Sequence, residues 1–208
     1  MQWRIKKLNY DILIPKSYGK HIYQFDEQEA ASYFEWYMEK VPERVAYVSK
    51  VCAKELHISE EKMDLSPESL LLLWKWFRQR AQKEKIPKSE RTNSIPASHW
   101  ANKHQLTLET EYIIRDIGMY VGETFRKNNP QIYWTYYTKP HNDFFVNYPL
   151  LKGFVDKISN QTFCPVFEPI HMTRMQALNI LDNTSKDTDL FKIYNIWSKK
   201  TGDGLREP

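Results

Sequence analysis

The sequence predicts an α+β fold in which a helical N-terminal half packs against a small, mostly antiparallel sheet in the C-terminal half. Apolar residues recur at intervals of three and four through much of the first half and again over residues 108–127, as in amphipathic helices. Residues 131–138 are rich in β-branched and aromatic side chains and lie between prolines, which predicts a strand. At 208 residues, the chain suits one substantial core, so we interpret residues 1–208 as a single domain.

The first half begins with an extended stretch, after which two helices are expected. Asp26 and Glu29 have the spacing of a capping box, which predicts a helix start. Proline is tolerated in the first turn of a helix and disfavoured in its interior, so Pro42 predicts that a second helix begins there. A third helix start is predicted where Ser66 precedes Pro67.

This third helix has apolar residues on two sides. Leu72 and Trp76 project roughly opposite its core face, at about 100° per residue. A second apolar side is either enclosed in the core or presented to a partner. Because Trp and Arg are enriched at binding hot spots, we expect a protein-binding surface near this helix. The residues assigned to that surface are Leu72, Trp76, Arg80, Lys83 and Trp100.

Residues 75–91 are predominantly basic, with seven Lys or Arg against two Glu. Such a run more often forms a solvated face than a binding site. Nucleic-acid binding through residues 75–91 is an alternative function, although a net charge of +4 is too small to indicate it alone. A stretch of loop composition follows, and any internal joint of the domain is expected at residues 84–105.

Thr107 is predicted to cap a helix over residues 108–127. Gly118 and Gly122 lie four residues apart on it, and each glycine costs about 1 kcal/mol in a helix interior. Two glycines at that spacing indicate that another backbone packs closely against them.

The predicted sheet of three to five strands begins with the strand at residues 131–138. Its expected partners are Phe144–Val146 and Phe154–Ile158, separated by a turn, and Cys164–Phe167 is expected as a short edge element. A helix capped by Thr173 and a last helix from about residue 187 to 199 complete the chain.

No motif for a catalytic, metal-binding or cofactor-binding site is found. The glycine spacing matches neither nucleotide-binding fingerprint, and the histidines lack the spacing of a metal-binding helix. Asp116 and Glu123 share a helix side about 10.5 Å apart, too far for a glycosidase pair. We therefore expect both to be structural, hydrogen-bonded acids. The alternative is an enzyme of unknown class with a site assembled from Tyr112, Asp116, Glu123 and His141.

The two cysteines and the length of the apolar segments predict the cellular compartment of the protein. Cys52 and Cys164 show no disulfide or metal pattern and are interpreted as small buried hydrophobes in a reducing compartment. No apolar run approaches the roughly 20 residues that span a bilayer, and no signal-peptide pattern is present. We expect a cytoplasmic protein without membrane contact.

One segment carries a resemblance to known proteins. It comprises Asp116–Phe125, then Trp134, then Asn147–Pro149. It resembles a helix–hairpin unit of uncharacterised bacterial cytoplasmic proteins, some encoded as immunity proteins beside secreted polymorphic toxins. The resemblance implies a structural role for Gly122, Glu123 and Trp134, namely helix–strand packing and one buried, hydrogen-bonded acid.

Together these observations favour a non-enzymatic protein that binds one specific protein partner. The absence of catalytic motifs and the aromatic content of 14% support this interpretation, because aromatic side chains are enriched at interfaces. The resemblance implies, as an expectation, an immunity protein whose partner is a toxin.

Overall fold

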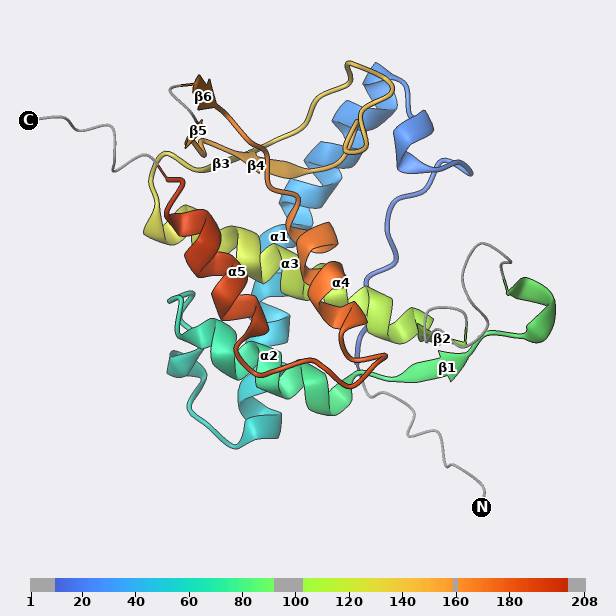
Figure 1. The fold of residues 1–208 in the computed structure, drawn as a ribbon, viewed down its shortest axis with the longest axis vertical. Helices are drawn as coiled ribbons and strands as arrows, with labels where there is room; N and C mark the ends of the chain where they lie inside the picture. The colour runs from blue at the N-terminus through green and yellow to red at the C-terminus, as the bar shows by residue number, and fades with distance from the viewer. Residues whose placement is uncertain (1–9, 92–102, 159–160, 202–208) are drawn as a thin grey trace, which may run out of the picture.

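The computed structural model describes residues 10–91, 103–158 and 161–201 (Figure 1). Its helices are α1 (Glu27–Leu56), α2 (Ser69–Arg80), α3 (Leu108–Asn128), α4 (Pro169–Leu178) and α5 (Asp189–Ser198). Three short 3-10 helices are also described: η1 (Ile22–Gln24) before α1, η2 (Glu60–Lys62) between α1 and α2, and η3 (Lys88–Glu90) after α2. Helix α3 lies at the centre and contacts α1, α2, α4 and α5. The mixed α+β class with a helical N-terminal half is confirmed.

Helix α1 corrects the prediction of two helices. Its start is as expected, since Asp26 accepts from the Glu29 backbone N–H and Glu29 from that of Asp26, both at 2.9 Å. However, the helix continues for 30 residues with Pro42 inside it. An interior proline costs about 3 kcal/mol. Tyr37 and Val41 are buried before the proline, and further residues in the same helical phase are buried after it. The burial of this continuous face offsets the cost of the proline.

Polar side chains accept hydrogen bonds from backbone N–H groups at the starts of α2, α3 and α4, whereas Thr188 makes no such bond at the start of α5. The Ser66 hydroxyl accepts from the Ser69 backbone N–H at 3.3 Å, and Thr107 caps α3 as predicted. The prediction that Thr173 caps a helix is wrong by five residues. Glu168 caps α4 instead, with Pro169 at its first position, where a missing N–H costs least.

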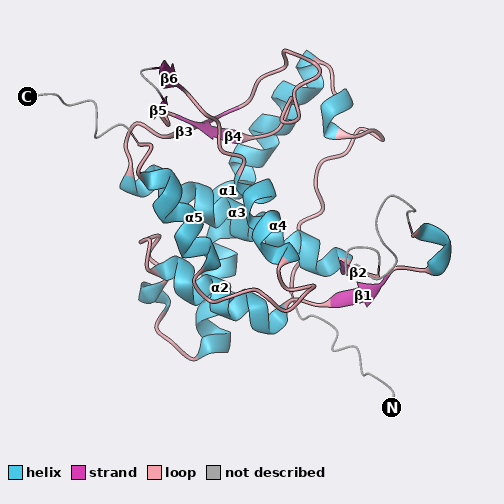
Figure 2. Cartoon of the chain, in the orientation of Figure 1, coloured by secondary structure: helices cyan, strands magenta, loops and turns pink. Residues whose placement is uncertain are grey.

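The β structure consists of three separate two-stranded antiparallel sheets among the described residues, and the single sheet expected from the sequence is wrong (Figure 2). The pairs are β1 (Lys83–Lys85) with β2 (His104–Leu106), β3 (Tyr133–Thr135) with β4 (Leu150–Lys152), and β5 (Asp156–Ile158) with β6 (Gln161–Phe163). The pairing of β1 with β2 joins the two ends of the segment at residues 84–105, where an internal joint of the domain was expected.

The predicted strand Phe144–Val146 is a turn. Asp143 accepts from the Phe145 backbone N–H at 2.8 Å, and Asn147 has a φ of 67°, so the chain reverses there. Strand β3 pairs with Leu150–Lys152 instead, with Trp134 opposite Leu151. Phe167 forms a single bridge to Leu151, which is all that remains of the predicted edge element.

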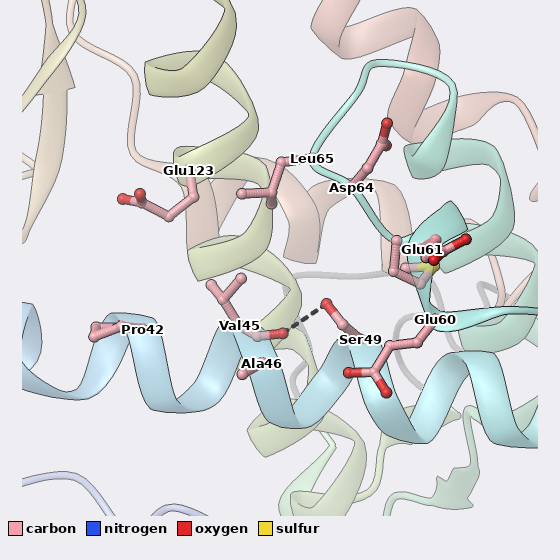
Figure 3. Close-up of a pocket in the computed structure, with 10 residues that line it drawn as sticks. Pro42, Val45, Ala46, Ser49, Glu60, Glu61, Asp64, Leu65 and Glu123 are labelled. Carbon is pink, nitrogen blue, oxygen red and sulfur yellow. Dashed lines mark hydrogen bonds between the residues drawn. The ribbon is translucent and has the colours of Figure 1, made fainter.

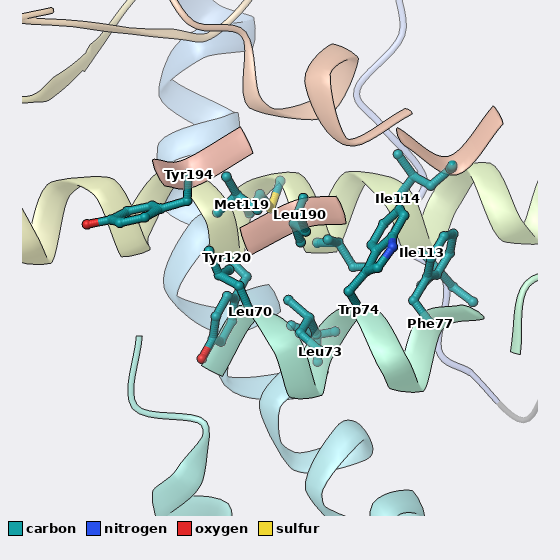
Figure 4. Packing of buried hydrophobic residues seen from close by; sticks show 14 of the residues in the cluster. Leu70, Leu73, Trp74, Phe77, Ile113, Ile114, Met119, Tyr120, Leu190 and Tyr194 are labelled. Carbon is teal, nitrogen blue, oxygen red and sulfur yellow. The ribbon is translucent and has the colours of Figure 1, made fainter. Parts of the chain in front are cut away.

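The core is aromatic and is organised around α3. Figure 4 shows side chains of α2 and α5 facing α3. The fully buried residues at this junction include Leu70, Leu73, Trp74, Phe77, Ile113, Ile114, Met119 and Tyr120. A second group of stacked and edge-on rings lies beyond them, formed by Phe125, Phe154, Phe167, Tyr194 and Trp197.

The two glycines of α3 mark close approaches. A Cβ at Gly118 would lie 2.8 Å from the Ile170 Cα, which confirms the predicted approach of another backbone. At Gly122 the neighbour is a side chain, because a Cβ there would lie 2.1 Å from the Trp134 ring.

We therefore expect Gly122→Ala to destabilise the protein. The clash with Trp134 costs about 1–3 kcal/mol, against up to about 1 kcal/mol gained in helix propensity. Urea denaturation measures the difference. The double variant Gly122→Ala/Trp134→Phe should be less destabilised than the sum of its single changes, because the smaller ring admits the methyl group. A Gly122→Ala variant more stable than the original chain would contradict this packing.

Candidate functional site

The surface predicted around Leu72 and Trp76 is not an open apolar face. Trp76 is only 1% exposed, and its indole N–H donates to Glu55 at 2.7 Å. The expectation that Trp76 faces a partner is therefore wrong, because α1 and Tyr10 cover this side of α2. Leu72 is half-buried against the core. Trp100 lies outside the described residues.

Arg78, Arg80 and Lys83 form contacts within the chain. Arg80 pairs with Glu55, and Arg78 pairs with Asp187. The Lys83 ammonium donates to the Leu181 carbonyl at 3.3 Å. These contacts hold residues 78–83 against α1 and the segment between α4 and α5. They leave fewer free cations for the phosphates of a nucleic acid.

Asp116 lies in a buried network that ties three segments together. Its carboxylate accepts from the Tyr10 hydroxyl at 2.6 Å and from the Arg44 guanidinium at 2.6 Å. Arg44 also donates to the Asp11 carbonyl. Burial raises the pKa of the Asp116 carboxyl, while the hydrogen bonds from Arg44 and Tyr10 lower it. Asp116 thus makes buried hydrogen bonds to two other segments of the chain.

Glu123 is held by a different part of the chain. Its Oε1 accepts from the Trp134 indole N–H at 2.7 Å and from Arg126 at 2.9 Å. Trp134 also lies over Gly122, so the helix–strand packing that the resemblance implied is present at these three residues.

The alternative enzyme site is not assembled in the structure. Asp116 contacts α1 and the N-terminal segment, whereas Glu123 contacts β3. Tyr112 packs against Arg115, whose guanidinium lies 5.3 Å from the ring centroid. His141 is exposed in a turn. The four side chains therefore share no contact through which they could act on one substrate.

A groove not foreseen from the sequence lies between α1, the segment around η2, and α3 (Figure 3). Its volume is about 660 Å³. We call it the acidic groove, and its lining residues are Pro42, Val45, Ala46, Ser49, Glu60, Glu61, Met63, Asp64, Leu65 and Glu123. It combines apolar side chains with four carboxylates.

The wall at Asp64 and Leu65 is fixed in a strained shape. Leu65 has a φ of 61°, a left-handed conformation that costs a residue with a side chain about 1–2 kcal/mol. Helix α3 holds it there, since the Tyr120 hydroxyl accepts from the Leu65 N–H at 3.1 Å and Asn128 donates to its carbonyl at 2.8 Å. The groove is therefore a built feature rather than a gap beside a loose loop.

The carboxylates surround the groove and do not converge. In Figure 3, Glu123 projects from α3 and Asp64 and Glu60 from the segment around η2, and the three side chains point in different directions. Within the described ranges, no three acidic, histidine or cysteine side chains gather closely enough to hold a metal ion. The pKa of Asp64 is lowered by hydrogen bonds from Ser66, so this group carries its charge at neutral pH. Glu60 and Glu61 are exposed and form no ion pair among the described residues.

The groove thus offers carboxylates and apolar contact area. This set of groups suits a ligand with both cationic donors and apolar side chains.

No protein-family model matches the chain, and no significantly similar protein was found among curated sequences or solved structures. Of the helices formed by residues 10–91, 103–158 and 161–201, each is too short or too polar to cross a bilayer.

Proposed function

We propose that this chain is a non-enzymatic binding protein whose acidic groove accepts a basic, partly apolar segment of one protein partner. The observation that supports the proposal is charge complementarity. The chain has a net charge of +4, yet this groove is lined by four carboxylates and no Lys or Arg. Glu123 is already paired with Arg126, whereas Glu60 and Glu61 form no ion pair among the described residues. A segment with Lys or Arg between apolar residues would pair with the carboxylates and pack against the apolar side chains of the groove.

The partner class is a further part of the proposal. The resemblance carried by residues 116–149 supports an immunity protein that neutralises a toxin by covering its surface. An acidic groove would suit that role if the toxin presents a basic surface, as an enzyme acting on nucleic acid does. Binding by Leu72, Arg80 and Lys83 stays a prediction, now secondary to the groove.

Site-specific photocrosslinking in the native host tests the groove. We expect p-benzoylphenylalanine in place of Ala46, an exposed groove residue, to form an adduct with one partner protein. Mass spectrometry should place the crosslink in a segment that carries Lys or Arg among apolar residues. A toxin or secretion domain in that partner would support the immunity role, and a partner of another class would contradict that role alone.

Matched charge variants provide the control. Glu60→Gln/Glu61→Gln should reduce the adduct by about tenfold, because two carboxylates near bound cations contribute about 1.4 kcal/mol or more together. Glu35→Gln/Glu90→Gln changes the net charge equally at exposed positions outside the groove and should leave the adduct unchanged. Equal yields of adduct with both double variants, or no adduct at position 46, would contradict the proposed site.

A further inference from the structure

A second pocket, which shares no residue with the acidic groove, opens beside β4. Its volume is about 370 Å³, and its walls come from residues 137–143, from Lys152 and from residues 164–166. The turn that carries the first wall is the one closed by Asp143. Three separate segments therefore meet at this pocket.

The pocket has an excess of positive charge. It contains two ammonium groups, Lys139 and Lys152, and one carboxylate, Asp143. That carboxylate already accepts hydrogen bonds from the Tyr137 hydroxyl at 2.5 Å and from the Phe145 N–H at 2.8 Å. It is therefore oriented toward its own turn.

Lys152 is half-buried and has no acidic partner among the residues that the structure describes. Its ammonium lies 5.6 Å from the centroid of the Tyr137 ring. Lys139 is 70% exposed and pairs with Glu27 at 3.1 Å, an exposed contact that contributes little stability. Both lysines are thus available to a bound anion, and Lys152 is held in place by an aromatic ring.

We propose that this pocket binds a phosphate group, either free phosphate or the phosphate of a small molecule. A phosphate group carries about 1.5 to 2 negative charges at neutral pH, which suits two ammonium groups, and lysine binds phosphate as a point charge. Pro140 and Val166 leave apolar wall for a short organic body attached to that phosphate. A planar carboxylate would gain less, because the pocket has no guanidinium to bind it in a bidentate manner.

Cys164 provides a local reporter for this site. The sequence predicted a buried residue, which is wrong, since Cys164 is exposed at the pocket whereas Cys52 is buried as expected. A ligand in the pocket should shield the Cys164 thiol from a small alkylating reagent. The rate of alkylation, followed by mass spectrometry, therefore reports occupancy at this position alone.

The test compares inorganic phosphate, phenyl phosphate and benzoate as added ligands, at constant ionic strength set with chloride. We expect both phosphates to slow alkylation of Cys164 and benzoate to have little effect. Tighter binding of phenyl phosphate would assign the site to a phosphorylated small molecule, and equal binding would assign it to free phosphate. Absence of protection by either phosphate at millimolar concentration would overturn the proposal.

Charge variants separate a built site from general attraction. Lys152→Gln should weaken protection about tenfold or more, and Lys139→Gln, at a largely exposed residue, provides a second variant that should fold normally. Lys192→Gln removes the same charge from an exposed position on α5 and should leave protection unchanged. Equal protection in all three variants would show that no specific site exists.

Discussion

An Asp116→Ala variant is expected to lose about 3–5 kcal/mol of unfolding free energy. The change leaves the Arg44 guanidinium, which is 1% exposed, without its buried counterion. It also removes the acceptor of the Tyr10 hydroxyl, which is buried in the same network. Burying an unpaired charge is far more costly than losing a surface pair. Chemical denaturation at neutral pH measures the loss.

Two comparisons identify the cause of that loss. Asp11 also pairs with Arg44, at 3.4 Å, but its side chain is 77% exposed, so Asp11→Ala should cost no more than about 1 kcal/mol. The double variant Arg44→Met/Asp116→Leu should recover much of the stability, because apolar residues of similar volume often replace a buried ion pair without loss. If Asp116→Ala cost no more than Asp11→Ala, the network would not stabilise the fold.

The second large effect is a dependence of stability on pH through Glu168. Its carboxylate is buried and caps α4, accepting from the Ile170 N–H at 3.1 Å and from the His171 N–H. Burial raises the pKa of Glu168 to about 7, from an ordinary value of 4.5, although both hydrogen bonds and Arg115 oppose the rise. The hydroxyl groups of Tyr33, Tyr37 and Tyr148 also face this charge.

The direction of the effect follows from where the proton is held. Between pH 4.5 and about 7, the folded protein keeps the Glu168 proton while the unfolded chain loses it. The stability that the Glu168 proton contributes is therefore fully present below pH 4.5 and is lost as the pH rises through 7. A rise of this size corresponds to about 3 kcal/mol.

Glu168→Gln should remove that dependence, because its amide resembles the protonated acid and can still accept a hydrogen bond from the α4 backbone. His171 has a pKa lowered by burial, so it gives a slope of opposite sign in the same pH range. The measure is therefore the difference in unfolding free energy between the two proteins at pH 5 and pH 8. Parallel profiles would show that Glu168 does not hold its proton at neutral pH.

The parts of the fold predicted from sequence are those set by local contacts. The capping box of Asp26 and the cap at Thr107 each act within one helical turn, so their residue types suffice. Pro42 was misjudged because packing along the whole of α1 outweighs its local preference. The pairing of β3 was misjudged because the turn at Asn147 shifts the partner strand to residues 150–152.

The site was harder to predict, because each part of it comes from a separate segment. Helical phase alone placed Trp76 outward, and only the fold shows that Tyr10 and Glu55 cover it. Arg44 could have been found, since it lies three residues after Val41 and four before Val48 on the same apolar stripe. A charge at such a position indicates a buried partner. The acidic groove had no comparable signal.

Helix α1 also has a consequence for how the molecule opens. Its first turns pack through Ala30 and Tyr33 into a small hydrophobic cluster with Phe25, separate from the main core that contains Tyr37 and later residues. A cooperative unit with so few buried side chains opens at a lower free energy than the core does. One continuous helix therefore spans two regions of different local stability. Proteolysis and amide exchange would begin at its N-terminal end while the acidic groove, which starts at Pro42, stays intact.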